Sequence, residues 1–288
     1  MRVVKVTYNV IPVHDVLLPP LSSKVIKYLI LDGKILPFLK DLVTSRTKNK
    51  PLFISNLELG GRRLFSTGKP LRVKAGSIMR GKVSFPFTEE VLGERGGSFR
   101  TPYGEFQVSV EVLSVFDGSD VQVEGRNFLL EFLTPTLLAS KIYLPPSLHE
   151  RYGKIDSGYA LLPTPGLVIA AAYRQYAGLL GTTANQEADQ KAFKLLVLGN
   201  SLSRVVGFNL RPITAFLGEE EGRLRKTRGV VGWIEFDVLG PMKRRAAKYL
   251  AYSNYFGLGR GGGVGLGEVQ FRVVERSKGG GGEGELRT

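Results

Sequence analysis

The sequence predicts an α+β protein made of two tandem ferredoxin-like (RRM-like) domains. Strand and helix patterns in the first half follow the order β-α-β-β-α-β, a similar cycle follows in the second half, and a polar stretch at 117–126 separates the two. We therefore expect one domain over residues 1–122 and a second over 123–276. The glycine-rich tail at 277–288 cannot build a core, so we expect it to be flexible.

The first half begins with a run of β-branched residues at 2–11, which predicts a strand. Ser22 or Ser23 is a suitable cap for a helix whose apolar stripe lies within residues 24–31. Further helix is predicted at 33–44, disturbed by Pro37. The remaining elements are short strands at 51–57, 70–75 and 78–86, a short helix at 87–93, and an alternating strand at 104–116.

The second half repeats this order. Thr164 followed by Pro165 is an N-cap with proline at the first helical position, which predicts a helix to about Gln175. The other predicted elements are a strand at 127–134, a helical run after Asn185, long strands at 205–217 and 223–238, a helix at 241–254 and a last strand at 268–275.

Composition narrows the class of function. Lysine and arginine number 40 against 26 acidic residues, a net charge of +14, which favours a polyanionic partner. The longest plain apolar run, at 166–173, is too short for a membrane span of about 20 residues. The chain has no cysteine and only two histidines, which excludes thiol nucleophiles and metal sites built from several histidines. We expect a cytoplasmic nucleic-acid-binding protein with no membrane partner, no metal and no cofactor.

The segment GLGRGGGVGLG, at 257–267, is the strongest local signal. It contains GxGxxG, but a dinucleotide site needs a strand before the glycines and a helix after them. Here the predicted helix precedes and the strand follows, which argues against that interpretation. A tight helix-to-strand turn or a flexible loop remains open. The alternative is that a backbone without Cβ atoms approaches a phosphate beside Arg260.

Two glycine triplets carry a family resemblance. Gly257-Leu258-Gly259, five residues, and Gly265-Leu266-Gly267 before a last strand resemble the signature of the repeat-cleaving endoribonucleases of CRISPR systems. These belong to the RAMP superfamily, named for repeat-associated mysterious proteins. Residues 127–138 and 50–57 are similar to strands of that family. The resemblance implies two ferredoxin-like folds, a role in CRISPR antiviral defence, and CRISPR repeat RNA (precursor crRNA) as the substrate.

The resemblance also implies a reaction. Family members are similar in cutting RNA without metal: the ribose 2′-OH attacks the adjacent phosphate and leaves 2′,3′-cyclic phosphate and 5′-OH ends. This chemistry needs a base, an acid and cations for the developing charge. Many members have a histidine on or just after the first helix, whereas residues 21–50 of this sequence contain none. The resemblance therefore implies a variant in which lysines act together with an arginine of the second domain.

Four residues are the catalytic candidates. Lys24 and Lys27 share the non-core face of the first helix, Lys50 opens the next strand, and Arg228 lies on a basic hairpin of the second half. Each also has a structural interpretation, as part of a solvated helix face or an exposed hairpin edge. His14 is a competing base. The expected RNA-binding residues are Gly257, Gly259, Arg260, Gly265, Gly267, Arg225, Lys226, Lys243 and Arg244.

Two other functions stay open. The missing first-helix histidine favours a non-catalytic RAMP subunit that holds guide RNA in an effector complex. Charge alone favours a generic RNA-binding protein, which would not distinguish repeat RNA from scrambled RNA at fixed salt. Effector-complex subunits and a second copy of the chain are further partners that the sequence leaves open.

Overall fold

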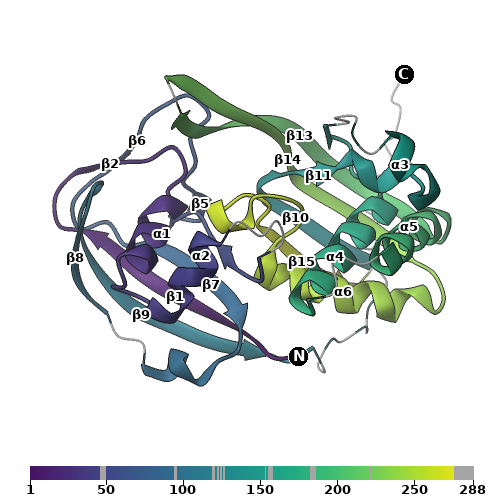
Figure 1. Cartoon of the computed structure of the whole chain (residues 1–288), viewed down its shortest axis with the longest axis horizontal. Coiled ribbons are helices and arrows are strands. Elements are labelled where there is room, and N and C mark those ends of the chain that lie inside the picture. The colour runs from purple at the N-terminus through teal and green to yellow at the C-terminus, as the bar shows by residue number, and fades with distance from the viewer. Residues whose placement is uncertain are drawn as a thin grey trace, which may run out of the picture.

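The computed structural model describes residues 1–45, 50–93, 96–118, 121, 123, 125, 127–152, 154, 158–181, 186–220 and 222–275. The tail expected at 277–288 lies outside these residues, as does Gln122 at the expected domain boundary. Two antiparallel sheets, each with helices packed against it, lie side by side (Figure 1). The α+β class and the tandem ferredoxin-like architecture are therefore confirmed.

The N-terminal sheet is built around β1, which is hydrogen-bonded to β7 on one side and to β9 on the other. Its strands follow the order β5-β4-β7-β1-β9-β8, with β3 also paired to β7. They are β1 (Val3–Pro12), β3 (Phe53–Ile54), β4 (Glu58–Leu59), β5 (Arg62–Arg63), β7 (Met79–Pro86), β8 (Gly97–Thr101) and β9 (Gly104–Phe116). Helix α1 (Ser23–Leu31) shares the core with this sheet through Val25, Ile26, Leu29 and Ile30, which are fully buried.

The C-terminal sheet has the order β13-β14-β10-β15. Its strands are β10 (Asn127–Thr136), β13 (Ser203–Glu220), β14 (Arg223–Val238) and β15 (Val269–Val274). Helices α4 (Pro165–Leu179), α5 (Gln186–Ser201) and α6 (Met242–Phe256) contribute to one core with its strands. The Thr164 hydroxyl accepts a hydrogen bond from the amide of Leu167 at 3.3 Å, so the predicted cap is confirmed. No helix in the described part is long and apolar enough to cross a membrane.

Short elements join these parts. The extended ones are β2 (Val16–Leu18), β6 (Leu71–Val73), β11 (Leu138–Ala139) and β12 (Tyr159–Ala160). The helical ones are η1 (Pro37–Leu39), α2 (Lys40–Thr44), η2 (Glu89–Gly93), η3 (Ser140–Tyr143), η4 (Pro146–Leu148), α3 (His149–Tyr152) and η5 (Gly262–Val264).

Three expectations about the first domain are wrong in detail. Neither serine caps α1: the Ser22 hydroxyl donates to the Leu64 carbonyl at 2.5 Å instead, and the Ser23 hydroxyl donates to the Val264 carbonyl at 2.7 Å. The predicted helix at 33–44 is confined to η1 and α2, because Pro37 and the left-handed backbone of Leu36 interrupt it. Strand β8 was not predicted, although it pairs with β9 along its length.

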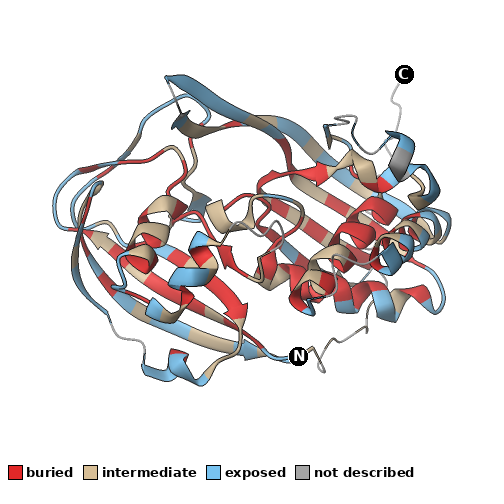
Figure 2. Cartoon of the chain, viewed as in Figure 1, coloured by how far each residue is buried: buried red, intermediate tan, exposed pale blue. Residues whose placement is uncertain are grey.

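The β13–β14 hairpin connects the two domains. It extends beyond its own sheet to the N-terminal domain, and its far end is largely exposed (Figures 1 and 2). The amide of Phe216 donates to the Ser66 carbonyl at 3.0 Å. The hairpin therefore contacts the first domain at a point far from the sheet that carries it.

Candidate active site

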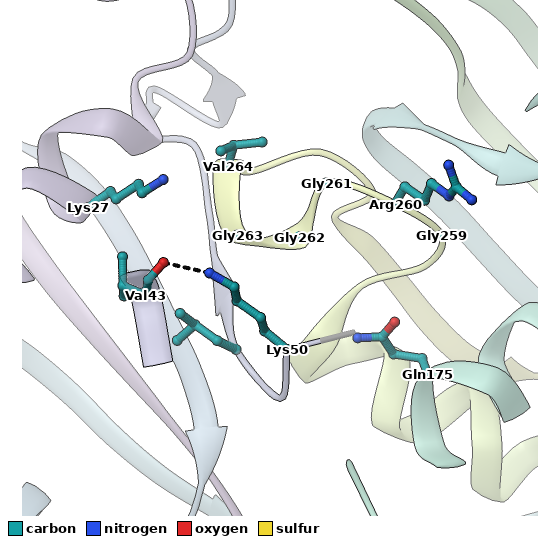
Figure 3. Close-up of a pocket in the computed structure, with 11 residues that line it drawn as sticks. Lys27, Val43, Lys50, Gln175, Gly259, Arg260, Gly261, Gly262, Gly263 and Val264 are labelled. Atoms are coloured by element: carbon teal, nitrogen blue, oxygen red, sulfur yellow. Dashed lines mark hydrogen bonds between the residues drawn. The ribbon is translucent and has the colours of Figure 1, made fainter. Parts of the chain in front are cut away.

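A cavity of about 240 Å³ lies where the two domains meet (Figure 3). The N-terminal domain contributes Lys27 from α1, together with Val43, Lys50 and Leu52. The C-terminal domain contributes Gln175 from α4 and the loop at 259–264. We call this cavity the junction pocket. Its lining comes from five chain segments of two domains, so it exists only when both domains are docked.

The two lysines of the junction pocket differ in environment. Lys27 is half-buried and points toward the turn at Gly263 and Val264 (Figure 3). The Lys50 ammonium donates to the Val43 carbonyl at 2.5 Å. Burial, together with the positive charge of Lys27, lowers the pKa of Lys50 below its usual value of 10.5. A lysine with a lowered pKa has more of the neutral amine that can accept a proton.

Lys24 lies elsewhere. Its ammonium donates to the Leu217 carbonyl on the β13–β14 hairpin at 2.7 Å. Burial lowers its pKa, and the nearby charges of Lys27 and Arg225 add to the effect. The structure thus separates the three candidate lysines: Lys27 and Lys50 line one pocket, whereas Lys24 connects the first helix to the hairpin.

The glycine triplets hold the loop together: Gly257, Gly265 and Gly267 are buried, whereas Gly259 is half-buried and lines the junction pocket. Their expected contact with RNA stays a prediction. Gly257, Gly259, Gly265 and Gly267 all have positive φ. A Cβ on any of them would overlap neighbouring atoms, and at Gly265 it would lie 2.6 Å from the Asn56 side-chain nitrogen. The amide of Leu258 donates to the Gly267 carbonyl at 2.8 Å, so the two triplets pair with each other. Glycine is needed at these positions for backbone conformation and close packing.

The glycines between the triplets do face the junction pocket. Gly261, Gly262 and Gly263 line it and are half-buried. Within the described part of the chain, their three amides donate to no protein acceptor. Unpaired backbone donors beside two lysines favour an anion in this pocket.

Asn56 and Ser23 join α1 to the glycine loop through contacts that the sequence does not indicate. Asn56 is fully buried; its side-chain oxygen accepts from the Ser23 amide at 3.2 Å, and its nitrogen donates to the Gly265 carbonyl at 2.7 Å. The Ser23 hydroxyl bonds the adjacent Val264 carbonyl. An asparagine within the strand predicted at 51–57 was the only signal, and it does not specify a partner more than 200 positions away.

A buried ionic contact also crosses the junction. The Arg63 guanidinium binds both carboxylate oxygens of Glu268 at 2.6 Å, and both side chains are 8% exposed. Lys82 lies 3.5 Å from the same carboxylate, and Glu58 also pairs with Arg63. Because Glu268 follows Gly267 directly, this cluster holds the end of the glycine loop against the first sheet.

The cationic candidates of the second domain lie at different places. Arg260 lines the junction pocket, but its guanidinium points away from Lys27 and Lys50 (Figure 3). Arg228 is exposed on β14 opposite Thr214 and is not among the residues that line the pocket. Arg225 and Lys226 are exposed farther along the hairpin, with Lys226 over the ring of Phe216.

Lys243 and Arg244 lie far from the glycine loop. They occupy the first turn of α6, and the loop begins after its last turn, roughly 20 Å along the helix axis. The Lys243 ammonium donates instead to the Gly125 carbonyl at 2.7 Å. These two charges therefore do not stand beside the glycine loop, although they are near it in sequence, and their expected contact with RNA stays a prediction.

The two histidines do not complete the site. His14 is exposed in the connection between β1 and β2 and is not one of the residues that line the junction pocket. The side chain of His149 lies outside the described residues. Among the described residues, no three His, Asp or Glu side chains cluster closely enough to hold a metal ion.

Fold and site together define a class: proteins with two tandem ferredoxin-like domains in which a glycine-rich loop of the second domain meets the first helix of the first. The Cas6 N-terminal domain model matches residues 4–116, and the CRISPR-associated endoribonuclease Cas6 model matches residues 130–269. The chain belongs to the Cas6 family of CRISPR-associated endoribonucleases.

Two relatives agree with this assignment, and solved structures share the fold. The chain is 46% identical to CRISPR-associated endoribonuclease Cas6 2 of Saccharolobus solfataricus over 96% of its own length and 98% of that protein. It is 44% identical to Cas6 1 of the same organism, over 95% and 98% of the two chains. A Cas6 product complex shares the fold with a TM-score of 0.60 at 14% identity, covering 93% of this chain and 99% of that one. A Thermus thermophilus Cas6 gives 0.56 at 14% identity, covering 94% and 98%.

Proposed function

We propose that this chain cleaves CRISPR repeat RNA into guide units in the junction pocket, without a metal ion. The 2′-oxygen of one ribose bonds to the adjacent phosphorus, the bond from phosphorus to the 5′-oxygen breaks, and the products carry 2′,3′-cyclic phosphate and 5′-OH ends. The proposal rests on one observation: Lys27 and Lys50 of the first domain line the same pocket as Gly261, Gly262 and Gly263 of the second domain. The family assignment and the net charge of +14 support an RNA substrate.

Each chemical role has a candidate in the pocket. Neutral Lys50 can donate to the Val43 carbonyl and still offer its lone pair, so it is suited to take the proton from the 2′-OH. The Lys27 ammonium gives a proton to the leaving 5′-oxygen. The amides of Gly261, Gly262 and Gly263 are placed to stabilise the charge that develops on the phosphate oxygens.

The remaining cations bind outside the reacting centre in this proposal. Lys24 holds the β13–β14 hairpin, and the side chains of Arg225, Lys226 and Arg228 are exposed on that hairpin and suited to phosphate contacts along the RNA. Arg228, which the family resemblance implies as the arginine of the reaction, instead contacts phosphate from the hairpin in this proposal.

The test is single-turnover cleavage of end-labelled repeat RNA in EDTA, followed by analysis of the product ends. We expect one cut, with a cyclic phosphate on the upstream product and a 5′-OH on the downstream product. RNA with a 2′-deoxyribose at the cut should bind and stay intact. A 5′-phosphate product, or a strict need for a divalent ion, would overturn the mechanism.

One alternative has an observation in its favour. The absence of a histidine from residues 21–50 suits a non-catalytic subunit that only holds guide RNA. Membership of an endoribonuclease family favours the enzyme. Tight binding of repeat RNA with no cleavage, in EDTA and in magnesium alike, would favour the subunit.

A further inference from the structure

A second cavity, of about 400 Å³, adjoins the junction pocket on the side of the C-terminal domain. The two cavities share Gln175, Gly259 and Arg260. We call this second cavity the Arg174 pocket, because Arg174 lines it and does not line the junction pocket. The two cavities are adjacent because they share these residues. If the phosphate of a nucleotide occupies the junction pocket, the base of that nucleotide can therefore reach the Arg174 pocket.

The lining of the Arg174 pocket is divided by chemistry. Leu137, Ile142 and Ala171 form an apolar part and are 4%, 7% and 5% exposed. Arg174 and Arg260 contribute cationic side chains. A phosphate gains nothing from an apolar wall, whereas a nucleobase has apolar faces and polar edges, so this combination suits a base.

Arg174 is held in place before any ligand binds. Its guanidinium pairs with the Asp189 carboxylate of α5, and its side chain is 38% exposed. Ala171, Arg174 and Gln175 are spaced three and four positions apart on α4, so they share one face of that helix. A guanidinium with a fixed orientation selects a ligand by geometry as well as by charge.

The Arg260 side chain completes the arrangement. Its backbone lines the junction pocket, but its guanidinium points away from Lys27 and Lys50 (Figure 3). It is exposed, and it also lines the Arg174 pocket. Arg260 therefore lies at the boundary between the position proposed for the phosphate and the position available to a base.

We propose that the Arg174 pocket binds the purine base of a nucleotide next to the scissile phosphate. Arginine and glutamine donors recognise the N7 acceptor, which purines have and pyrimidines lack. Arg174, Arg260 and Gln175 supply such donors around the apolar part of the pocket. The inference rests on the proposed function, because it takes the RNA to pass through the junction pocket.

The first experiment measures binding and does not depend on cleavage. Repeat RNA carrying a 2′-deoxyribose at the cut is prepared with 2-aminopurine at each purine position in turn. Removal of a base from the RNA stack raises 2-aminopurine fluorescence. We expect a rise on binding at a position next to the cut, lost in Arg174→Ala and retained in Arg204→Ala, a control at an exposed arginine on β13 that lines neither cavity. No rise at any position, or the same rise in Arg174→Ala, would overturn the proposal.

The second experiment measures cleavage. Replacing the purine at that position by its 7-deaza analogue should slow single-turnover cleavage by wild-type protein about tenfold, as expected for loss of a base-edge contact. Arg174→Ala should cleave unmodified RNA about tenfold more slowly, with no further loss on 7-deaza RNA. Arg174→Lys, which keeps the charge and loses the planar fork, should behave like Arg174→Ala.

The outcomes separate this proposal from the proposed function. If Arg174→Ala slowed cleavage relative to wild-type protein by the same factor on normal RNA and on 7-deaza RNA, Arg174 would contact phosphate only. That result would overturn the base pocket and leave the cleavage mechanism intact. If wild-type protein cuts no RNA, the proposed function fails, and the fluorescence experiment still decides whether a base enters the Arg174 pocket. Circular dichroism melting of each variant identifies losses that come from misfolding.

Discussion

At the scale of single residues, Lys24, Lys27 and Lys50 show how position decides the role of one residue type. Lys24 is on the same helix as Lys27, yet its ammonium contacts a backbone carbonyl of the hairpin. Lys50 comes from another segment, yet it lines the same pocket as Lys27. The two pocket lysines should therefore control the rate, and Lys24 should mainly control how the hairpin docks.

We predict that Lys27→Ala slows single-turnover cleavage by about 10²-fold or more, because it removes a positioned proton donor. RNA affinity should change far less, since one charge among many contributes a small share of phosphate binding. Lys40→Ala is the control, at an exposed lysine of α2. Equal effects of the two variants on the cleavage rate would contradict a special role for Lys27.

We predict that the pH dependence of cleavage depends on Lys50. Its pKa lies below 10.5, so the neutral amine becomes more abundant as pH rises through that lowered value. The wild-type rate should rise with pH and level off before pH 10.5. Lys50→Arg keeps the charge but cannot lose its proton in this range, so its rate should be low and without the rise. A rise that persists in Lys50→Arg would assign the base to another group.

At the scale of elements, the glycine loop has two parts with different tasks. The glycines of the outer triplets have positive φ and pack against backbone or against Asn56. The middle glycines line the junction pocket, and a Cβ at Gly263 would meet nothing within 4 Å. A single motif therefore sets the fold of the loop at its ends and faces the RNA site in its middle.

Alanine substitutions should separate these tasks. Gly265→Ala forces a left-handed backbone on alanine and crowds Asn56, so it should lower the free energy of unfolding by at least about 1–2 kcal/mol. Gly263→Ala should leave that free energy nearly unchanged, because Gly263 does not have positive φ and no atom lies within 4 Å of the position of an added Cβ. It should still slow cleavage, because the added methyl group enters the junction pocket. Urea denaturation and single-turnover cleavage rates test both variants. A strong loss of stability in Gly263→Ala would contradict the assignment of a structural role to the outer glycines alone.

At the scale of the whole molecule, the site depends on how two domains dock. Asn56 and Ser23 join α1 to the glycine loop, and Arg63 and Lys82 hold Glu268 directly after it. Burial lowers the pKa of Lys82, while the carboxylate of Glu268 opposes that shift. Polar contacts across the junction need exact partners, so they fix one relative placement of the domains.

Removing one member of the buried ionic contact should be costly. Glu268→Gln leaves Arg63 buried with weaker compensation and should destabilise the protein by about 3–5 kcal/mol. The double variant Arg63→Met, Glu268→Leu should recover part of this loss, because both charges are removed. Urea denaturation of Arg63→Met, of Glu268→Leu and of the double variant gives the coupling between the two side chains. Strictly additive losses would mean that the two side chains act independently.

Local patterns in the sequence were enough for the fold. Alternating strands such as β9, the Thr164–Pro165 start of α4 and the apolar stripe of α1 depend on neighbours a few positions apart. The expected α+β order and the tandem architecture followed from them. The Ser22 cap failed because a hydroxyl bonds whichever partner the tertiary structure brings close, here Leu57 and Leu64.

The candidate site was only partly accessible from sequence. Its charge, its glycine motif and the residue types on α1 are properties of the chain itself, and they pointed to an RNA-processing protein. Only the tertiary structure placed Lys50 with Lys27, directed Lys24 to the hairpin, packed the glycine triplets against neighbouring backbone and Asn56, and paired Glu268 with Arg63. The physical reason is the sequence separation over which each interaction acts. Periodicity and capping depend on residues a few positions apart, whereas the pocket is made by contacts between segments about 200 positions apart. No local pattern encodes such contacts.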